Sequence, residues 1–330
     1  MRVAQLGAGR IGAMHAEILS RLVEPGSLLV ADTDPARARE VAGAVGAEAA
    51  EIEAAIATAD ALVIAASSTA HPELIRAGIA RGIPVFCEKP LATDLEETKR
   101  LVDEIERSGI RFQLGFQRRF DAAYREARRL VEDGSLGQLY VMRLAGHDPA
   151  PPHEAYIPLS GGIFNDFSVH DFDVTRWLTA QEVEEVYADG GVLGFPVFAK
   201  YDDVDTAVAT LRLSGGTRCI LSVTRHDPLG YDIRTELFGS GDSVSIGLGP
   251  RTPMRSLEPG VAPPAGPAWS MFIDRFSDAY ENELRAFLRV ARGEEESACT
   301  ARDGLEAVRV AVAATRSLRE HRPVRVAEVV

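Results

Sequence analysis

Lysine is scarce in this chain of 330 residues: only three lysines occur, and arginine supplies almost all the other positive charge. One of the three, Lys89, follows a short apolar run and precedes Pro90. An ammonium group can release its proton, and its pKa moves readily when it is desolvated, whereas a guanidinium stays charged. The scarcity therefore makes Lys89 a candidate catalytic residue, with an ordinary surface lysine at the end of a strand as the plainer alternative.

Cysteine and long apolar runs are also scarce. The three cysteines, Cys87, Cys219 and Cys299, lie far apart and form no Cys-x-x-Cys pair. This spacing suggests neither a disulfide framework nor a zinc site. No stretch has the length of a signal peptide core or a membrane span. We therefore expect a reduced, cytoplasmic protein that does not enter a membrane.

The chain has no excess of positive charge. Its formal net charge is -13 and its pI is about 5.1, which argues against nucleic-acid or anionic-membrane surfaces, because both need clustered lysine and arginine. The length predicts two domains, taking roughly 150 residues for each. The expected partners are therefore small molecules bound by a two-domain protein.

Up to about residue 115, short apolar runs alternate with amphipathic stretches, a pattern typical of a parallel sheet covered by helices. We predict an α/β doubly wound Rossmann domain over residues 1–119. Its strands are predicted at Val3–Leu6, Leu28–Ala31, Ala61–Ala66, Ile83–Cys87 and Phe112–Leu114. Its helices are predicted at Ile11–Leu22, Pro35–Val45, Pro72–Arg81 and Asp94–Ser108, with Asp34 as the N-cap of the second.

After residue 119 the runs become longer and the turns, such as 214–216 and 239–242, become those that join antiparallel neighbours. We predict an α+β domain over residues 120–330 with a mostly antiparallel open sheet. After a helix at Asp121–Glu132, its strands are predicted at Leu139–Leu144, Val183–Val192, Thr206–Leu213, Arg218–Thr224, Ile233–Phe238 and Ser243–Leu248. A surface loop at Pro250–Pro267 and helices near Phe272–Arg292 and Ala301–Glu320 are predicted to follow.

The segment Gly7–Gly12 reads Gly-x-Gly-x-x-Gly and lies between the first predicted strand and helix. In that place Gly7 permits a tight turn, Gly9 lets a pyrophosphate approach the backbone, and Gly12 lets the helix pack closely on the strand. The phosphates would face the helix N-terminus. The segment therefore predicts dinucleotide binding, with a tight turn that binds nothing as the alternative.

Asp32 comes 20 residues after Gly12, at the end of the second predicted strand. A carboxylate there accepts hydrogen bonds from the hydroxyls of an adenosine ribose and repels a 2′-phosphate, so NAD is favoured over NADP, although the nearby Arg37 keeps NADP open. An ordinary strand-end cap is the alternative for Asp32. In the loop that follows the predicted strand Ala61–Ala66, Ser67 and Ser68 either reach the cofactor or cap the following helix.

A second group of polar residues begins at Asp166. If a helix starts here, Asp166, His170 and Asp173 occupy positions i, i+4 and i+7 and share one face. A carboxylate one turn from an imidazole raises its basicity and suits it to acid–base chemistry. A buried structural hydrogen bond is the alternative. A metal site lacks a third ligand at similar spacing, so no metal is predicted.

The two groups together suggest hydride transfer. A nicotinamide removes hydride from a carbon that bears a hydroxyl, and the hydroxyl proton leaves to a base. His170 is a suitable base, and Lys89 can stabilise the charge that develops on oxygen.

These motifs resemble the glucose-fructose oxidoreductase, inositol dehydrogenase and rhizopine catabolism (Gfo/Idh/MocA) family over essentially the whole chain. The resemblance is carried by Gly7–Gly12, Cys87–Leu91, Gly115–Asp121, Asp166 and His170. Within the family, the chain looks most like bacterial inositol 2-dehydrogenases. The segments responsible are Asp148–Pro152, Ser160–Phe164, His170–Asp173 and Gly230–Asp232.

The resemblance implies a Rossmann domain, an α+β domain whose open sheet forms homodimers or homotetramers, and oxidation of myo-inositol to 2-keto-myo-inositol with NAD. It implies a catalytic set of Lys89, Asp166 and His170. The implied substrate residues are Lys89, Arg118, Arg119, Asp148, Asp166, His170, Asp173 and Tyr231. The expected cofactor residues are Gly7, Gly9, Arg10, Ile11, Gly12, Asp32, Ser67, Ser68, His71 and Glu88.

Two departures bear on the substrate. His147 replaces an arginine that inositol dehydrogenases usually carry, and Leu229 replaces a tyrosine expected in the substrate pocket. A pocket that loses a donor discriminates less well between polyols, so a related inositol isomer or a sugar pyranose is the alternative substrate. A protein of another class, a non-catalytic NAD-binding regulator that senses sugars, is the second alternative.

Overall fold

The computed structural model describes residues 1–329, which divide into two compact units. The first unit comprises Met1–Phe120 together with Asp278–Leu305, and the second comprises Asp121–Ser277 together with the residues from Glu306 onward. The sequence analysis predicts that all residues after 119 belong to the second domain. In the structure, Asp278–Leu305 packs with the first unit instead. The sequence could not show this difference, because an amphipathic helix has the same pattern whichever unit it packs on.

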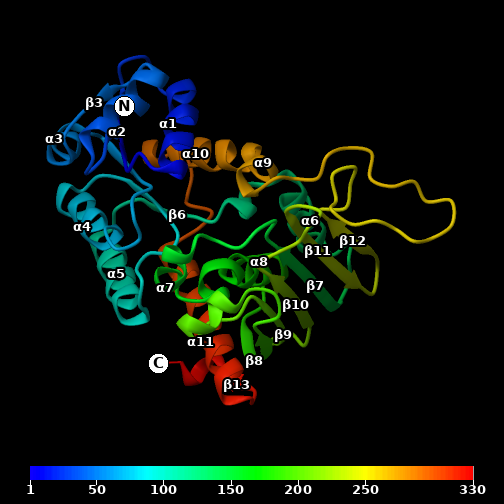
Figure 1. The fold of residues 1–330 in the computed structure, drawn as a ribbon. Coiled ribbons are helices and arrows are strands. Elements are labelled where there is room, and N and C mark those ends of the chain that lie inside the picture. Colours follow the sequence, from blue (N-terminus) through cyan, green and yellow to red (C-terminus); the bar gives the residue numbers. More distant parts are fainter. Residues whose placement is uncertain (330) are drawn as a thin grey trace. The chain divides into compact units, whose positions relative to one another are not determined.

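The first unit contains a six-stranded sheet in the order β3-β2-β1-β4-β5-β6, and every neighbouring pair is parallel. Figure 1 labels its two edge strands, β3 and β6. Its strands are β1 (Val3–Leu6), β2 (Leu28–Ala31), β3 (Glu48–Ala49), β4 (Ala61–Ile64), β5 (Val85–Glu88) and β6 (Phe112–Gly115). β1, β2 and β4 are buried along their whole length, as expected for strands covered on both faces. The predicted doubly wound sheet is confirmed.

The helices of the first unit are α1 (Arg10–Leu22), α2 (Pro35–Val45), α3 (Ile52–Thr58), α4 (His71–Arg81), α5 (Leu95–Ser108) and most of α10 (Ser277–Arg292). Asp34 caps α2 as predicted, because its carboxylate accepts hydrogen bonds from the backbone N–H groups of Ala36 and Arg37. The sequence analysis missed β3 and α3, whose few residues give too short a pattern to recognise.

The second unit contains a seven-stranded sheet in the order β12-β11-β7-β10-β9-β8-β13. Its strands are β7 (Leu139–His147), β8 (Val183–Gly191), β9 (Thr206–Leu213), β10 (Arg218–Thr224), β11 (Asp232–Gly239), β12 (Ser243–Ile246) and β13 (Val324–Arg325). All neighbouring pairs are antiparallel except β7 and β10, which are parallel. The predicted mostly antiparallel sheet is confirmed.

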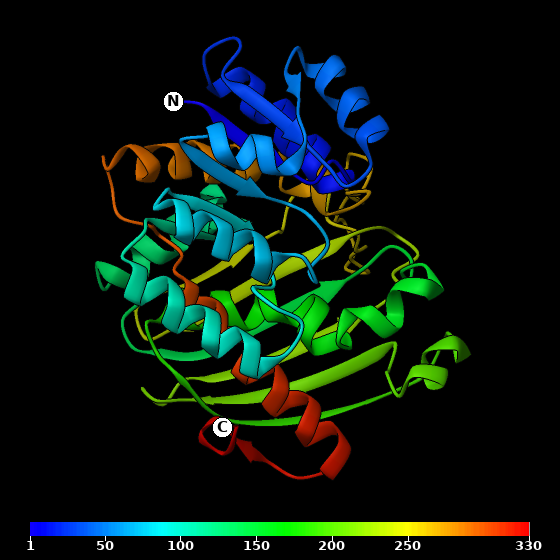
Figure 2. The ribbon, with the colours of Figure 1, turned by 90° about the vertical axis from the view of Figure 1, so that its left-hand side faces the viewer.

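One face of this sheet is covered and the other is open. Met142, Leu144 and Gly146 of β7 are buried, whereas Arg143 is exposed, which is the period-2 alternation of a strand with one covered face. Figure 2 shows α8 (Val169–Thr179) lying across the long strands, and α8 packs on β7. The open face is therefore the one opposite α8.

The remaining helices are α6 (Ala122–Glu132), α7 (Ile157–Ser160), α9 (Phe272–Arg275) and α11 (Ala301–Glu320). The predicted helix near residues 272–292 is divided at Phe276 into α9 and α10. Among the described residues, none of the helices combines the length and the apolar character that a membrane span requires.

Candidate functional site

The turn between β1 and α1 is held by close backbone contacts that only glycine allows. Gly7 has a φ of 96°, and a β-carbon there would lie 2.5 Å from the carbonyl oxygen of Ala65. A β-carbon at Gly12 would lie 2.0 Å from the carbonyl oxygen of Gly7. Both glycines therefore serve the packing of the turn, as predicted from the motif.

Gly9 differs from the other two glycines. No described atom lies within 4 Å of the place that its β-carbon would take, and α1, which begins at Arg10, has no side-chain cap. The first N–H groups of a helix need partners from outside it, and an open approach to such N–H groups suits a pyrophosphate. The turn therefore fits the phosphates of NAD.

Asp32 links the glycine turn to the end of β2. One of its carboxylate oxygens accepts from Ala8 N at 2.7 Å, and the other accepts from Asp34 N at 2.8 Å. The strand-end capping considered from the sequence is thus present. Oδ1 also accepts from Thr33 Oγ1 at 3.4 Å, whereas Oδ2 keeps a second lone pair for a ribose hydroxyl. Arg37 Nη1 lies 3.6 Å from Asp32 Oδ1, so its charge is turned towards this carboxylate.

His71 connects the loops that follow β4 and β5. Its Nδ1 lies 2.7 Å from Pro90 O and its Nε2 lies 3.2 Å from Ala66 O. Burial lowers the pKa of the His71 imidazole, although the two carbonyls act in the opposite direction. Both ring nitrogens therefore face protein carbonyls, and cofactor binding by His71 stays a prediction.

Ser67 and Ser68 are predicted either to reach the cofactor or to cap the following helix, α4. The N-cap of α4 is Ala70, with no side-chain cap, so neither serine caps this helix. Ser67 is exposed and its Oγ lies 3.2 Å from Thr69 Oγ1. Cofactor binding by Ser67 and Ser68 stays a prediction.

Lys89 is half-buried and follows directly on β5, as the sequence predicted, and its peptide bond to Pro90 is cis. The Oε1 atom of its neighbour Glu88 lies 2.7 Å from His15 Nε2, so the two side chains form a hydrogen bond. His15 is fully buried in α1. Sequence analysis missed His15, because 73 residues separate it from Glu88 and no local pattern connects them.

Arg118 and Arg119 are both buried in the 3₁₀ turn Gln117–Phe120. Arg119 donates to Ala298 O at 2.8 Å and lies 3.1 Å from Asp303 Oδ1. Arg119 thus holds the segment before α11, and substrate contact by Arg118 or Arg119 stays a prediction.

In the second unit, Asp166 lies in a π-helical turn, Phe164–Ser168, directly before α8. The sequence analysis assumed an α-helix from Asp166 onward, whereas this turn bonds i to i+5 and winds more widely. The shared face of Asp166, His170 and Asp173 stays a prediction. His170 is half-buried in the first turn of α8, and Asp173 is fully buried. Single π turns are frequent at functional sites.

Both oxygens of the Asp166 carboxylate have donors. Tyr156 Oη donates to Oδ1 at 2.8 Å, and Arg225 Nη1 donates to Oδ2 at 2.8 Å. Arg225 Nη1 also lies 3.6 Å from Asp148 Oδ2. The structure thus brings together Asp148 and Asp166, two predicted site residues, through Arg225, and Tyr156 contacts Asp166 alone. The sequence analysis found neither Arg225 nor Tyr156.

His147 lies on the open face of the sheet. Gly146, the preceding residue, packs against Phe167, so close that a β-carbon would lie 2.3 Å from the ring, and successive residues of a strand point to opposite faces. The inference that His147 alters the substrate pocket is therefore not supported by its place in the second unit.

His147 instead faces two carboxylates: its Nδ1 lies 3.8 Å from Asp227 Oδ2 and 3.6 Å from Asp232 Oδ2. Ligand atoms of these three residues lie within 4.8 Å of one another, and this group shares no residue with the Asp166 segment that was considered for a metal from the sequence. Arg234 already holds Asp232 through two nitrogens at 2.8 and 2.9 Å, which reduces the negative charge offered to a cation.

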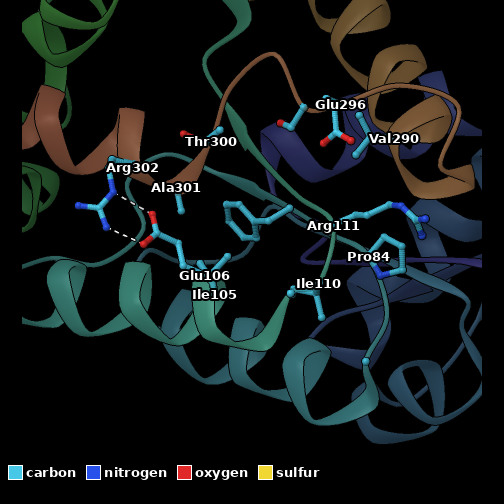
Figure 3. Close-up of a pocket in the computed structure, with 14 residues that line it drawn as sticks. Pro84, Ile105, Glu106, Ile110, Arg111, Val290, Glu296, Thr300, Ala301 and Arg302 are labelled. Carbon is cyan, nitrogen blue, oxygen red and sulfur yellow. Dashed lines mark hydrogen bonds and ion pairs between the residues drawn. The ribbon is translucent and has the colours of Figure 1, made fainter.

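A cavity of about 600 Å³ lies elsewhere in the first unit (Figure 3). It is lined by residues that precede β5 and β6, including Pro84 and Arg111, and by the ion pair of Glu106 with Arg302 at 2.6 Å. Ligands of open parallel sheets bind at the carboxyl ends of the strands. This cavity is at the amino ends of β5 and β6 and is therefore separate from the predicted nucleotide site.

Comparison with known proteins agrees with both units. Residues 1–116 match the model of an oxidoreductase family with an NAD-binding Rossmann fold, and residues 124–245 match the Gfo/Idh/MocA C-terminal domain. The chain is 41% identical to the myo-inositol dehydrogenase Hyg17 of Streptomyces leeuwenhoekii over 96% of this chain and 97% of that protein. It is 36% identical to the myo-inositol 2-dehydrogenase of Thermotoga maritima over 100% of both chains.

Solved structures show the same fold. The scyllo-inositol dehydrogenase of Lactobacillus casei, with NAD(H) and scyllo-inositol bound, superposes with a TM-score of 0.88, at 28% identity and over 99% of both chains.

The different surroundings of Gly9 and Gly12 predict different effects of the same substitution. Gly12→Ala should lower the melting temperature, because its β-carbon collides with the Gly7 carbonyl. Gly9→Ala should leave the melting temperature unchanged and weaken NAD binding about tenfold or more, which corresponds to about 1.4 kcal/mol. Calorimetry of NAD binding and thermal unfolding measure both quantities. Wild-type NAD affinity in Gly9→Ala would remove this glycine from the phosphate site.

The burial of His71 predicts that the stability of the folded protein depends on pH. Its pKa is lowered in the folded protein, so the stability that it contributes is complete above the unfolded pKa of about 6.5 and is lost as the pH falls below that value. The melting-temperature difference between wild type and His71→Asn should therefore shrink between about pH 8 and about pH 5. The exposed His321→Asn is the matched control. A difference that grows on acidification would contradict the prediction.

Proposed function

Because the chain belongs to the Gfo/Idh/MocA oxidoreductase family, we propose that it oxidises a secondary hydroxyl of a cyclitol with NAD. The leading reaction is oxidation of myo-inositol at carbon 2 to 2-keto-myo-inositol. The observation that carries the proposal is the combination, in one chain, of a glycine turn that fits a pyrophosphate and an Asp166 carboxylate held beside the start of α8. Relatives with this function match the chain over its whole length.

NAD, when bound, supplies the acceptor for the hydride. Within this proposal, Gly9, Arg10 and Ile11 face the phosphates at the start of α1, and Asp32 accepts from the ribose hydroxyls. The position of Arg37 supports NAD over NADP: its two terminal nitrogens lie 3.6 Å from Asp32 Oδ1 and 3.7 Å from Asp34 Oδ2. A guanidinium already directed at carboxylates is less suited to a 2′-phosphate.

His170 is proposed to take the hydroxyl proton, and Lys89 to stabilise the negative charge that develops on the substrate oxygen. Asp166 maintains a negative charge near the base, which favours the imidazolium that proton transfer produces. Lys89 comes from the first unit, whereas His170 and Asp166 come from the second. The proposed reaction therefore needs both units.

Arg118, Asp148 and Tyr231 are proposed to bind the substrate hydroxyls. Asp148 keeps part of its side chain exposed, and a carboxylate accepts hydrogen bonds only, which suits a polyol. Asp173 is fully buried in α8, and it is proposed to contact the substrate from the same helix as His170. Leu229, half exposed, offers no hydrogen bond, which keeps another inositol isomer or a sugar pyranose as the alternative substrate.

We also propose that the chain forms a homodimer or homotetramer through the open face of the second sheet. Apolar side chains stand on that face: Val208 is 51% exposed and Ile220 is 48% exposed, with Tyr187 on the neighbouring β8. Grouped exposed apolar residues commonly mark interaction surfaces.

The test is NADH formation by the purified protein with myo-inositol, scyllo-inositol, glucose and xylose. We expect NADH with myo-inositol, and we expect Lys89→Ala to lower kcat by at least about 100-fold while NAD affinity stays nearly unchanged. Lys99→Ala, which removes a lysine paired with Glu96 on α5, is the matched control and should behave as wild type. Full activity in Lys89→Ala would refute the catalytic assignment. NAD binding without NADH formation from any polyol would favour the non-catalytic regulator.

A further inference from the structure

Arg225 is the most deeply buried cation of the second unit's candidate site. Its side chain is 2% exposed, and its Nη1 lies 2.8 Å from Asp166 Oδ2 and 3.6 Å from Asp148 Oδ2. A buried guanidinium is costly unless it is paired. One arginine therefore joins the two carboxylates that the proposed function uses for catalysis and for substrate binding.

The sheet register explains why Arg225 and Asp148 meet. In the parallel pair of β7 and β10, His147 is opposite Thr224, so the next residues, Asp148 and Arg225, leave the sheet side by side. Backbone hydrogen bonds fix both: Asp148 N donates to Thr224 O at 3.0 Å, and Arg225 N donates to Asp205 O at 2.8 Å. The guanidinium is thus presented from a rigid edge of the sheet.

Asp203 connects this edge to the π turn. Its Oδ1 accepts from Ile163 N at 3.1 Å, immediately before the turn that carries Asp166. Asp203 is also one of the charges that act on Arg225. The start of the turn and the carboxylate within it are therefore anchored to the same part of the second unit.

The positive charge of Arg225 and the negative charges of Asp166 and Asp148 stabilise one another. Burial by itself lowers the pKa of the Arg225 guanidinium, but Asp166 and Asp148 outweigh that effect, and the pKa is raised. The attraction is mutual, so the guanidinium also favours the ionised forms of the carboxylates. Tyr156 adds a hydrogen bond to the other oxygen of Asp166, which fixes the plane of the carboxylate.

We propose that Arg225 is a positioning residue that keeps Asp166 ionised and correctly oriented beside His170, with Tyr156 as the second anchor. The inference rests on the proposed function, because it assigns Arg225 a task in that reaction. Arg225 does not itself need to touch the substrate or NAD. Its effect should therefore appear in kcat and in the pH dependence, more than in NAD affinity.

The experiment compares Arg225→Met, Arg225→Lys and Tyr156→Phe in the full-length protein. We expect Arg225→Met to lower kcat by about 100-fold with a smaller change in KM. The pH below which kcat/KM falls should rise by about one unit or more, since loss of a neighbouring opposite charge changes a carboxylate pKa by about 1–3 units. Arg225→Lys should restore part of kcat and most of the pH profile.

The control is Arg176→Met. Arg176 forms a two-nitrogen pair with Glu182, at 2.6 and 2.9 Å, from the last turn of α8, so its loss removes an equivalent ion pair away from Asp166. It should lower the melting temperature without moving the pH profile. If Arg225→Met does not fold, Tyr156→Phe decides: Tyr156 is largely exposed, and its loss should move the profile in the same direction by a smaller amount.

An Asp166→Asn background separates this inference from the proposed function. There, Arg225→Met should cause no further change in the pH profile, because the carboxylate that it serves is gone. An unchanged pH profile in the single variant Arg225→Met would overturn the positioning role. Where Arg225→Met does not fold, an unchanged pH profile in Tyr156→Phe would do the same. An equal effect of Arg225→Met in the wild-type and Asp166→Asn backgrounds would also overturn it. If Asp166→Asn alone were fully active, the proposed function's use of Asp166 would fail instead.

Discussion

The parallel pairing of β7 with β10 is the constraint on which the second unit's candidate site depends. Parallel neighbours need a crossover connection, unlike the tight turns that join antiparallel strands. Here the crossover runs through the π turn, α8, β8 and β9 before the chain enters β10. Asp166 and His170 lie within this connection and Asp148 lies at its start, whereas Arg225 directly follows the carboxyl end of β10, beside Asp148. One exception in an otherwise antiparallel sheet therefore gathers the polar residues of the site.

The sequence was sufficient wherever a local pattern corresponds to a local structure. The glycine turn, the Asp34 cap and the position of Lys89 after β5 all follow from a few neighbouring residues. The choice of fold class also followed, because strand length and turn type differ between the two halves of the chain. In each of these cases the residues that carry the signal lie within a short stretch of the chain, although Gly7 also packs against the distant Ala65.

The sequence was insufficient where the deciding interaction is distant. Arg225 is 59 positions from Asp166, and only the sheet register brings the two together. The π turn at Asp166 has no recognisable pattern of its own, so a regular α-helix was the natural prediction. His147 illustrates the same limit: its neighbour Gly146 touches Phe167, and a strand's alternation then turns His147 to the other face.

The return of Asp278–Leu305 to the first unit means that the second unit is, in its larger part, an insertion within the first unit's chain. Gln113 Nε2 of β6 donates to Glu283 O of α10 at 3.0 Å, and Leu114 N donates to Cys299 O at 2.9 Å. A fragment that stops at Phe120 would lose both acceptors and uncover the edge of β6. An excised nucleotide-binding fragment would need the later segment reattached by a linker, since a single cut cannot release it intact.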